Sequence, residues 1–228
     1  MSTIGETKLV LNIEKFNASK KALEFLENDM VVGLGTGTTV AEFLKLLGKK
    51  VREENLKIVG VSTSFDTTIL AMKEKIPLLH PEEVEHIDIS FDGADVIEKD
   101  HLIKGGGGAL AREKIVDYAA KKFIVLADES KLHRQGFRIP IEVIPFSTFF
   151  VLNSLKEMGG EPSIRMAHEK VGPTVTDNGN LLLDCKINIK NPKKLESDIN
   201  NIPGVVENGI FTKFHKVIIG TKEGARIL

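Results

Sequence analysis

The sequence predicts an α/β fold: a domain with a parallel sheet, joined to a smaller α+β unit later in the chain. Between about residues 12 and 126, short apolar runs alternate with segments whose apolar residues recur at helical spacing. Strands that alternate with helices favour a parallel sheet covered on both faces. After about Ser130 the expected strands are shorter and only two further helices follow, which indicates a separate α+β unit.

The composition is that of an ordinary globular protein. The 228 residues are 42% hydrophobic and 28% charged, and the formal net charge is −1. This charge offers no general attraction for nucleic acid or membrane, and residues 1–16 are too broken by charges for a signal peptide or a membrane span. Cys185 is the only cysteine, so we expect no intramolecular disulfide and no CxxC site. We therefore expect a protein of the reducing cytoplasm.

The first half of the chain supplies the parallel sheet. The helix expected over 38–50 shows the pattern most clearly, because Val40, Phe43, Leu44 and Leu47 share one face. Ligands of such sheets bind at the carboxyl ends of the strands, so the loops that follow the strands are candidate sites. The expected strands cover 30–35, 57–62, 86–95 and 122–128, and the expected helices cover 13–27, 38–50, 64–75 and 109–122.

The second half predicts the smaller unit. Asn178-Gly179 between two apolar runs is the favoured turn of a two-residue hairpin. We place the large domain at 1–130 plus 208–228 and the small α+β domain at 131–207, with the last strand returning to the large sheet. The expected elements are strands over 139–145, 163–167 and 217–221, a hairpin over 175–189, and helices over 147–160 and 191–202.

The first candidate loop is GLGTGTTV, residues 33–40, between a strand and a helix. Its glycines permit a tight turn, and its threonines add hydroxyl donors at a helix N-terminus, where free N–H groups and the helix dipole favour an anion. It is not a Walker loop, because no Gly-Lys-Ser/Thr follows, and Thr38 stands where the dinucleotide fingerprint needs its third glycine. A capped helix with a glycine turn is the alternative. The candidate residues are Thr36, Gly37, Thr38 and Thr39.

The second loop is SFDGAD, residues 90–95, at the end of the third strand. Asp92 and Asp95 flank Gly93 and Ala94, and two carboxylates at this spacing can share a ligand's hydroxyls, bind a cation or serve proton transfer. The alternative is an Asx turn that satisfies its own backbone. Nearby histidine and acidic residues match no standard metal spacing, so we expect no metal.

The third loop is IKGGGGALAREK, residues 103–114. Consecutive glycines cost backbone entropy and pack no core, so the loop must need bare backbone, with Lys104 beside Gly105, Gly106 and Gly107. Glu113 falls in the first or second turn of the following helix, where it is either a dipole-stabilising surface residue or a general base. Lys131 follows the fourth strand and adds a cation at the same sheet edge.

These motifs resemble ribose-5-phosphate isomerase of the A type. GLGTGTT, SFDGAD, KGGGGALAREK and ADESK occur in that order, and the resemblance continues through IPIEVIP, GPTVTDNGN and NNIPGVVENGIF, nearly the whole chain. It implies a Rossmann-like domain with a small domain inserted late in the chain, in a homodimer or homotetramer. It also implies interconversion of D-ribose 5-phosphate and D-ribulose 5-phosphate in the non-oxidative pentose phosphate pathway, without cofactor or metal.

The resemblance also assigns roles to residues. In the family, the threonine loop holds the substrate phosphate with help from the residues that correspond to Lys131 and Lys15, and Glu113 corresponds to the base. The family's aspartate loop usually reads DGADE, so this chain departs from the pattern with Val96 in place of the final Glu. The chemistry moves a proton from C2 to C1 through an enediolate, whose oxyanion Lys104 and the glycine N–H groups would stabilise. Asp92 and Asp95 would hold sugar hydroxyls and assist ring opening.

Two other classes of function stay open at this point. A non-catalytic sugar-phosphate sensor would use the same fold type, but it should carry a DNA-binding helix-turn-helix, for which few residues precede the first strand. A metal-dependent phosphatase would use Asp92 and Asp95, and it predicts loss of activity with a chelator and release of free phosphate.

Overall fold

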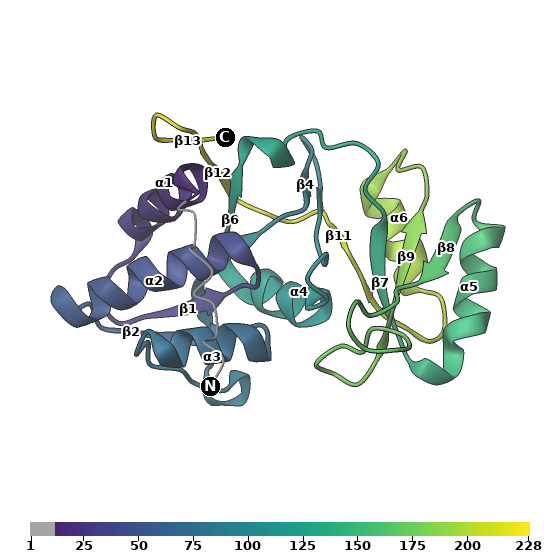
Figure 1. Cartoon of the computed structure of the whole chain (residues 1–228), viewed down its shortest axis with the longest axis horizontal. Helices are drawn as coiled ribbons and strands as arrows, with labels where there is room; N and C mark the ends of the chain where they lie inside the picture. The colour runs from purple at the N-terminus through teal and green to yellow at the C-terminus, as the bar shows by residue number, and fades with distance from the viewer. Residues whose placement is uncertain (1–11) are drawn as a thin grey trace, which may run out of the picture.

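The computed structural model describes residues 12–228. Residues 1–11 lie outside it, and they include most of the segment 1–16 for which we expected neither a signal peptide nor a membrane span. Figure 1 shows two lobes side by side, joined by strands that run between them. The large lobe holds α1 to α4 and the six-stranded sheet, and the small lobe holds α5, α6 and a four-stranded sheet. No helix of the described part is long and apolar enough to cross a membrane.

The sheet of the large lobe is parallel except at one edge, where β13 pairs antiparallel with β12. Its strands, in spatial order, are β13 (Ala225–Ile227), β12 (Lys216–Gly220), β6 (Ala120–Asp128), β3 (Ile87–Gly93), β1 (Met30–Leu34) and β2 (Ile58–Ser62). The return of the chain to this sheet through β12 confirms the expectation from sequence. The helices are α1 (Ile13–Ala22), α2 (Thr38–Glu53), α3 (Phe65–Lys73) and α4 (Leu110–Ala119).

The two faces of β3 have different neighbours, because successive side chains of a strand point to opposite faces. Ile89 and Phe91 join the main core together with residues of α1 and α2. Ser90 lies on the other face, close to Val116 of α4. Asp92, two residues further along, shares that face and comes at the end of the strand. The alternation therefore buries a carboxylate between the sheet and α4, at the edge where the loops lie.

The small lobe is built on an antiparallel sheet over its own core. Cys185 is buried there as a free thiol, as expected for an apolar filler. Its strands, in spatial order, are β10 (Val205–Asn208), β7 (Ile139–Val143), β9 (Leu181–Lys186) and β8 (Glu161–Ile164), and its helices are α5 (Thr148–Glu157) and α6 (Pro192–Asn200). A third sheet consists of β11 (Ile210–Phe211), β5 (Leu102–Ile103) and β4 (Val96–Ile97), and short 3-10 turns cover Leu23–Phe25, Pro81–Glu83, Glu129–Lys131 and Pro145–Ser147.

The structure differs from the expected elements in the hairpin over 175–189. The turn is present, with Gly179 at φ +79°, but its first arm is reduced to a single bridge between Val175 and Leu181. Strand β9 pairs with β7 and β8 instead. The helix expected over 13–27 also ends early, at Ala22, before a 3-10 turn. The domain boundaries at 130/131 and 207/208 stay a prediction.

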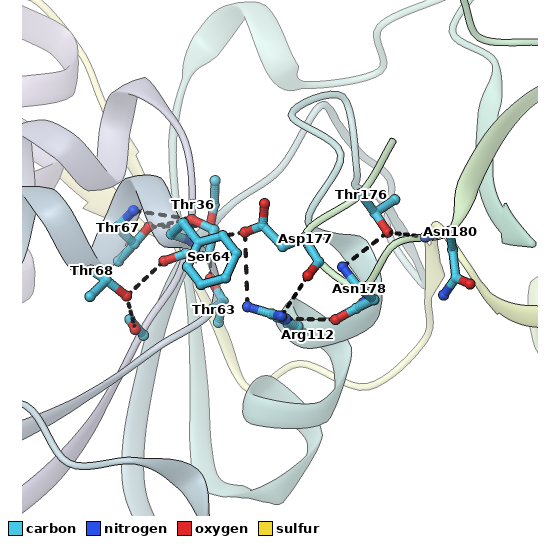
Figure 2. Close-up of polar contacts among 12 residues, drawn as sticks. Thr36, Thr63, Ser64, Thr67, Thr68, Arg112, Thr176, Asp177, Asn178 and Asn180 are labelled. Carbon is cyan, nitrogen blue, oxygen red and sulfur yellow. Dashed lines mark hydrogen bonds and ion pairs between the residues drawn. The ribbon is translucent and has the colours of Figure 1, made fainter. Parts of the chain in front are cut away.

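The turn at residues 176–180 of the small lobe contacts the large lobe. Figure 2 shows Arg112 of α4 directed at Asp177 and Asn178, with hydrogen bonds of 2.9 Å to the Asp177 carbonyl and 2.7 Å to Asn178 Oδ1. The Asp177 carboxylate also accepts the Phe65 N–H at the start of α3 (2.8 Å). Buried Glu142 shapes the turn, because one carboxylate oxygen accepts from Thr176, Asn178 and Asn180. These contacts tie the small lobe to the residues that surround the predicted site.

Candidate active site

The three predicted loops meet at one pocket. The first two follow β1 and β3 of the parallel sheet, whereas the third follows β5 of the three-stranded sheet and leads into α4. Asp92 does not line this pocket but lies buried behind it, and Lys15 reaches the same loops from α1 through a 2.6 Å hydrogen bond to Thr38 Oγ1. All the other predicted site residues line it: Thr36, Gly37, Thr38, Thr39, Gly93, Ala94, Asp95, Lys104, Gly105, Gly106, Gly107, Glu113 and Lys131.

The threonine loop places the N-terminus of α2 at this pocket. Gly37 is the N-cap at φ +117°, a conformation that favours glycine, and no side chain caps the helix. Figure 2 shows Thr36 among Thr63, Ser64 and Thr67, whose hydroxyls lie 2.8, 2.8 and 3.2 Å from its Oγ1. The Thr36 hydroxyl therefore holds the loop against α3, and the uncapped N–H groups of the helix remain for an anion.

A buried cluster of three charged side chains lies at the pocket. Lys104 Nζ is 2.8 Å from Asp92 Oδ2 and 3.4 Å from Glu113 Oε2, and it donates to the Gly93 carbonyl at 2.6 Å. All three side chains are nearly or fully buried. Asp92 Oδ1 accepts the N–H groups of Thr36 and Gly93, so this carboxylate joins the threonine loop to Lys104. Within the described residues, Glu113 Oε2 has no hydrogen-bond partner.

The electrostatics of the cluster keep the lysine charged and make the glutamate a stronger base. Burial, followed by the negative charge of Asp92, raises the pKa of Glu113 to about 8, against the opposing effect of Lys104. Burial alone would lower the pKa of Lys104, but the charges of Asp92 and Glu113 outweigh it and raise that pKa above its ordinary value. The pocket thus combines a permanent cation with a carboxylate whose pKa lies near neutrality, where general bases work best.

Three of the four glycines in the third loop are required by the backbone or by packing, and the fourth is not. Gly105 and Gly108 have φ of +100° and +84°, in the left-handed region. A Cβ on Gly106 would lie 2.7 Å from the Asp95 carboxylate, which accepts the Gly106 N–H. A Cβ on Gly107 would meet nothing closer than 3.8 Å, so packing does not require this glycine. The bare backbone at Gly107 faces the pocket and leaves room there.

Two further residues near the pocket were not predicted from the sequence. Asp117, one helical turn after Glu113 on α4, is fully buried, and neither carboxylate oxygen has a hydrogen-bond partner in the described part. Burial and the charge of Asp92 raise the pKa of Asp117 well above its usual value. Arg165 of the small lobe contacts the glycine loop from the side of β8. For Asp117, only its spacing of four residues from Glu113 on the same helix could have indicated a place near the site. For Arg165, the sequence carries no signal.

The rest of the described chain offers fewer chemical features. No group of three or more His, Cys, Asp or Glu side chains in residues 12–228 is arranged to hold a metal ion. A larger groove of about 500 Å³ lies along α4 and α6. The buried Lys114 in its wall is paired with Glu196 and Glu207, both at 2.9 Å. The pocket at the three loops is therefore the candidate active site.

Comparison with known proteins identifies the family. The profile of "Ribose 5-phosphate isomerase A (phosphoriboisomerase A)" matches residues 59–224. The chain belongs to this family. A ribose-5-phosphate isomerase A from Methanocaldococcus jannaschii is 51% identical over 219 residues, covering 94% of this chain and 96% of the relative. One from Pyrococcus horikoshii is 44% identical over 227 residues, covering 96% and 99%.

Solved structures of relatives share the fold. The structure of the Methanocaldococcus jannaschii protein has a TM-score of 0.92 at 51% identity and covers 94% of this chain and 97% of its own. A structure of D-ribose-5-phosphate isomerase in complex with phospho-erythronic acid has a TM-score of 0.90 at 44% identity, covering 94% and 96%. The family is one of isomerases, and this supports an isomerase over the sensor and the phosphatase.

The departure from the family pattern at residue 96 has a structural explanation. Val96 lies in β4, is 4% exposed and packs in the core of the small lobe. It pairs with Ile103. Asp95, one residue earlier, still lines the pocket. The valine therefore faces the core, and the pocket keeps its aspartate.

Proposed function

We propose that the chain interconverts D-ribose 5-phosphate and D-ribulose 5-phosphate, with Glu113 as the base that carries the proton between C2 and C1. The observation that carries this proposal is the position of Glu113: it is buried at the wall of the pocket, 3.4 Å from the Lys104 ammonium, and its pKa is raised to about 8. A carboxylate with its ordinary pKa would be a weaker base for a C–H bond.

Lys104 and the glycine loop would stabilise the enediolate oxyanion. Removing a proton from C2 places negative charge on the oxygen of the former carbonyl, and a preorganised donor there is worth about 3–4 kcal/mol. Lys104 stays protonated because Asp92 and Glu113 raise its pKa. The Gly106 N–H already donates to Asp95, so the Gly107 N–H is the backbone donor we assign to the oxyanion.

The threonine loop would hold the phosphate. The N–H groups at the start of the 16-residue helix α2 and its dipole favour an anion there. Lys131 lines the same pocket, and Lys15 hydrogen-bonds to Thr38. The relative whose structure is titled a complex with phospho-erythronic acid supports this assignment, because that ligand joins a phosphate and a carboxylate on a short polyol. The proposed pocket would hold one anionic group at each end.

The two aspartates would have different roles. Asp95 lines the pocket, so we assign it to the sugar hydroxyls and to ring opening. Asp92 has one oxygen on the backbone of the threonine loop and the other beside Lys104, so neither is directed at the pocket. We assign Asp92 to holding Lys104 in place and charged, rather than to the sugar hydroxyls expected from sequence.

One assay separates this function from its alternatives. Ribose 5-phosphate is incubated with the protein with and without EDTA while ketose formation and free phosphate are followed together. We expect ketose to form at the same rate in both reactions, with no phosphate released. Release of phosphate that EDTA abolishes would support the metal-dependent phosphatase, and binding of ribose 5-phosphate with neither product would support the sensor.

We also propose that the chain forms a homodimer or homotetramer in the cytoplasm. Phe146, Phe149 and Phe150 are 90%, 74% and 69% exposed, and their spacing places them on one side of the start of α5. Contiguous exposed apolar patches of this kind often mark interfaces. Sedimentation of the wild type against Phe149→Ser should show an oligomer that the substitution weakens. A wild type that sediments as a monomer would contradict the proposal.

A further inference from the structure

Arg165 extends from the small lobe to the back of the glycine loop. It follows strand β8, and its Nη1 donates to the carbonyl oxygens of Gly105 at 3.0 Å and Gly106 at 3.1 Å. Neither Arg165 nor its partner Asp184 lines the pocket. Arg165 therefore contacts the loop through its carbonyl groups, while the same loop presents its N–H groups elsewhere.

The geometry of the peptide bond connects these contacts to the pocket. In a trans peptide the carbonyl of one residue and the N–H of the next point in opposite directions. Holding the Gly105 carbonyl sets the direction of the Gly106 N–H, which donates to Asp95 at 2.7 Å. Holding the Gly106 carbonyl sets the direction of the Gly107 N–H, the donor assigned above to the oxyanion. The Gly105–Gly106 peptide is also held by the Gly108 N–H, which donates to the Gly105 carbonyl, and by Asp95. Arg165 therefore matters most for the Gly106–Gly107 peptide, whose carbonyl it holds between two glycines of wide conformational freedom.

Arg165 is itself held in position. Its Nε and Nη2 donate to the two oxygens of Asp184 at 2.9 and 2.5 Å, a bidentate pair that fixes the plane of the guanidinium. Its backbone is tied on both sides, because its N–H donates to the Leu182 carbonyl and its carbonyl accepts the Thr174 N–H. A lysine could supply the charge but not this planar fork.

We propose that Arg165, oriented by Asp184, is a positioning residue that aims the Gly107 N–H at the reacting end of the substrate while the Gly106 N–H stays on Asp95. The inference rests on the proposed isomerase function and adds a role for the small lobe in it. A correctly aimed donor contributes where charge develops, so its loss should reduce turnover more than substrate binding.

The test compares Arg165→Lys and Arg165→Ala with the wild type in the isomerase assay. We expect kcat to fall about 10- to 100-fold in Arg165→Ala, with KM within about threefold, and added methylguanidinium to restore part of the lost kcat. Arg165→Lys should lie closer to the alanine variant than to the wild type, because the fork is lost although the charge remains. Asp184→Asn should reduce kcat less than Arg165→Ala, since the amide oxygen of the asparagine can still accept one of the two hydrogen bonds from Arg165.

Arg138→Ala is the matched control, because this arginine also hydrogen-bonds to the small-lobe sheet, at the Glu161 carbonyl, but not to the glycine loop. It should leave kcat unchanged. Normal turnover in Arg165→Ala, or a rise in KM alone, would overturn the positioning role. If Arg165→Ala does not fold, Arg165→Lys and Asp184→Asn decide in the same way. A wild type without ketose formation would instead remove the proposed function itself, which keeps the two failures distinct.

Discussion

Two buried lysines, Lys104 and Lys114, lie only ten residues apart and both face the ring of Phe211, yet their surroundings differ. Their ammonium groups are 5.3 and 4.7 Å from the centre of the Phe211 ring. Lys114 donates to Glu196, Glu207 and the Ile210 carbonyl, one acceptor for each proton. The Lys104 cluster leaves carboxylate oxygens of Asp92 and Glu113 without hydrogen bonds in the described part.

The difference separates a structural cluster from a catalytic one. A buried charge is stable when it is paired and hydrogen-bonded, as Lys114 is. Incomplete pairing costs stability, and in this cluster burial and the negative charge of Asp92 raise the pKa of Glu113 against the opposing charge of Lys104. Lys104 and Glu113 line the pocket, so a substrate can supply the missing partner of Glu113. Substitutions in the Lys104 cluster should therefore reduce turnover, and substitutions in the Lys114 cluster should reduce stability.

The largest effect should follow removal of the base. In Glu113→Gln the side chain keeps its size but cannot accept the C2 proton, so kcat should fall by about 10²–10⁴-fold or more. KM should stay within a few-fold, because the phosphate contacts lie in other loops. Exchange of the C2 proton with solvent deuterium, followed by NMR, should fall in parallel. Near-normal turnover would end the assignment of Glu113 and move the search to Asp95.

The same substitution at each lysine tests the comparison directly. Lys104→Met keeps the packed stem but removes the cation beside the developing oxyanion, so kcat should fall by about 10²–10³-fold. Some stability should also be lost, because Asp92 and Glu113 remain buried without their cation. Turnover per folded molecule, measured with circular dichroism as a check on folding, is the deciding quantity. A variant that binds poorly but turns over normally would make Lys104 a substrate clamp only.

Lys114→Met should give the opposite result. Two glutamates lose their buried partner, so the free energy of unfolding should fall by about 3 kcal/mol. The kcat at a temperature where the variant is folded should stay within twofold of the wild type. Chemical denaturation and the isomerase assay on the same preparation measure both quantities. A large loss of kcat in a folded Lys114→Met would erase the distinction between the clusters.

These two clusters also show which features can be predicted from the sequence and which cannot. The strands of five or more residues and the residues of the three loops were predicted, because periodicity and glycine spacing are local signals. The two-residue strands β4, β5 and β11 carry no period and were missed. Lys104 and Lys114 both stand near glutamates in the sequence. What distinguishes them is contact with partners such as Glu196, 82 residues from Lys114, which no local pattern reveals.

The pH dependence provides a smaller test of the same division. Glu113 must be ionised to act, and its pKa is raised from 4.5 to about 8, so kcat/KM should rise about tenfold per pH unit below 8 and level off above it. Because the charge of Lys104 lowers this pKa, Lys104→Met should shift the profile to higher pH. Lys114→Met should leave it in place. A wild-type profile that is flat from pH 5 to 9 would show that ionisation of Glu113 does not limit the reaction.

The smallest effect concerns the space above the Lys104 cluster. A methyl group on Gly107 has nothing closer than 3.8 Å in the free structure, so Gly107→Ala should fold with unchanged stability. The same methyl occupies room that the substrate needs, and mild crowding of about 1 kcal/mol should raise KM roughly fivefold. Gly106→Ala is the matched contrast, because its methyl would lie 2.7 Å from the Asp95 carboxylate and disturb the protein before any substrate binds. Thermal unfolding without substrate should therefore be altered in Gly106→Ala and normal in Gly107→Ala. If Gly107→Ala binds substrate as well as the wild type does, the reacting sugar does not lie against this glycine, and the oxyanion donor must be sought at Lys104 alone.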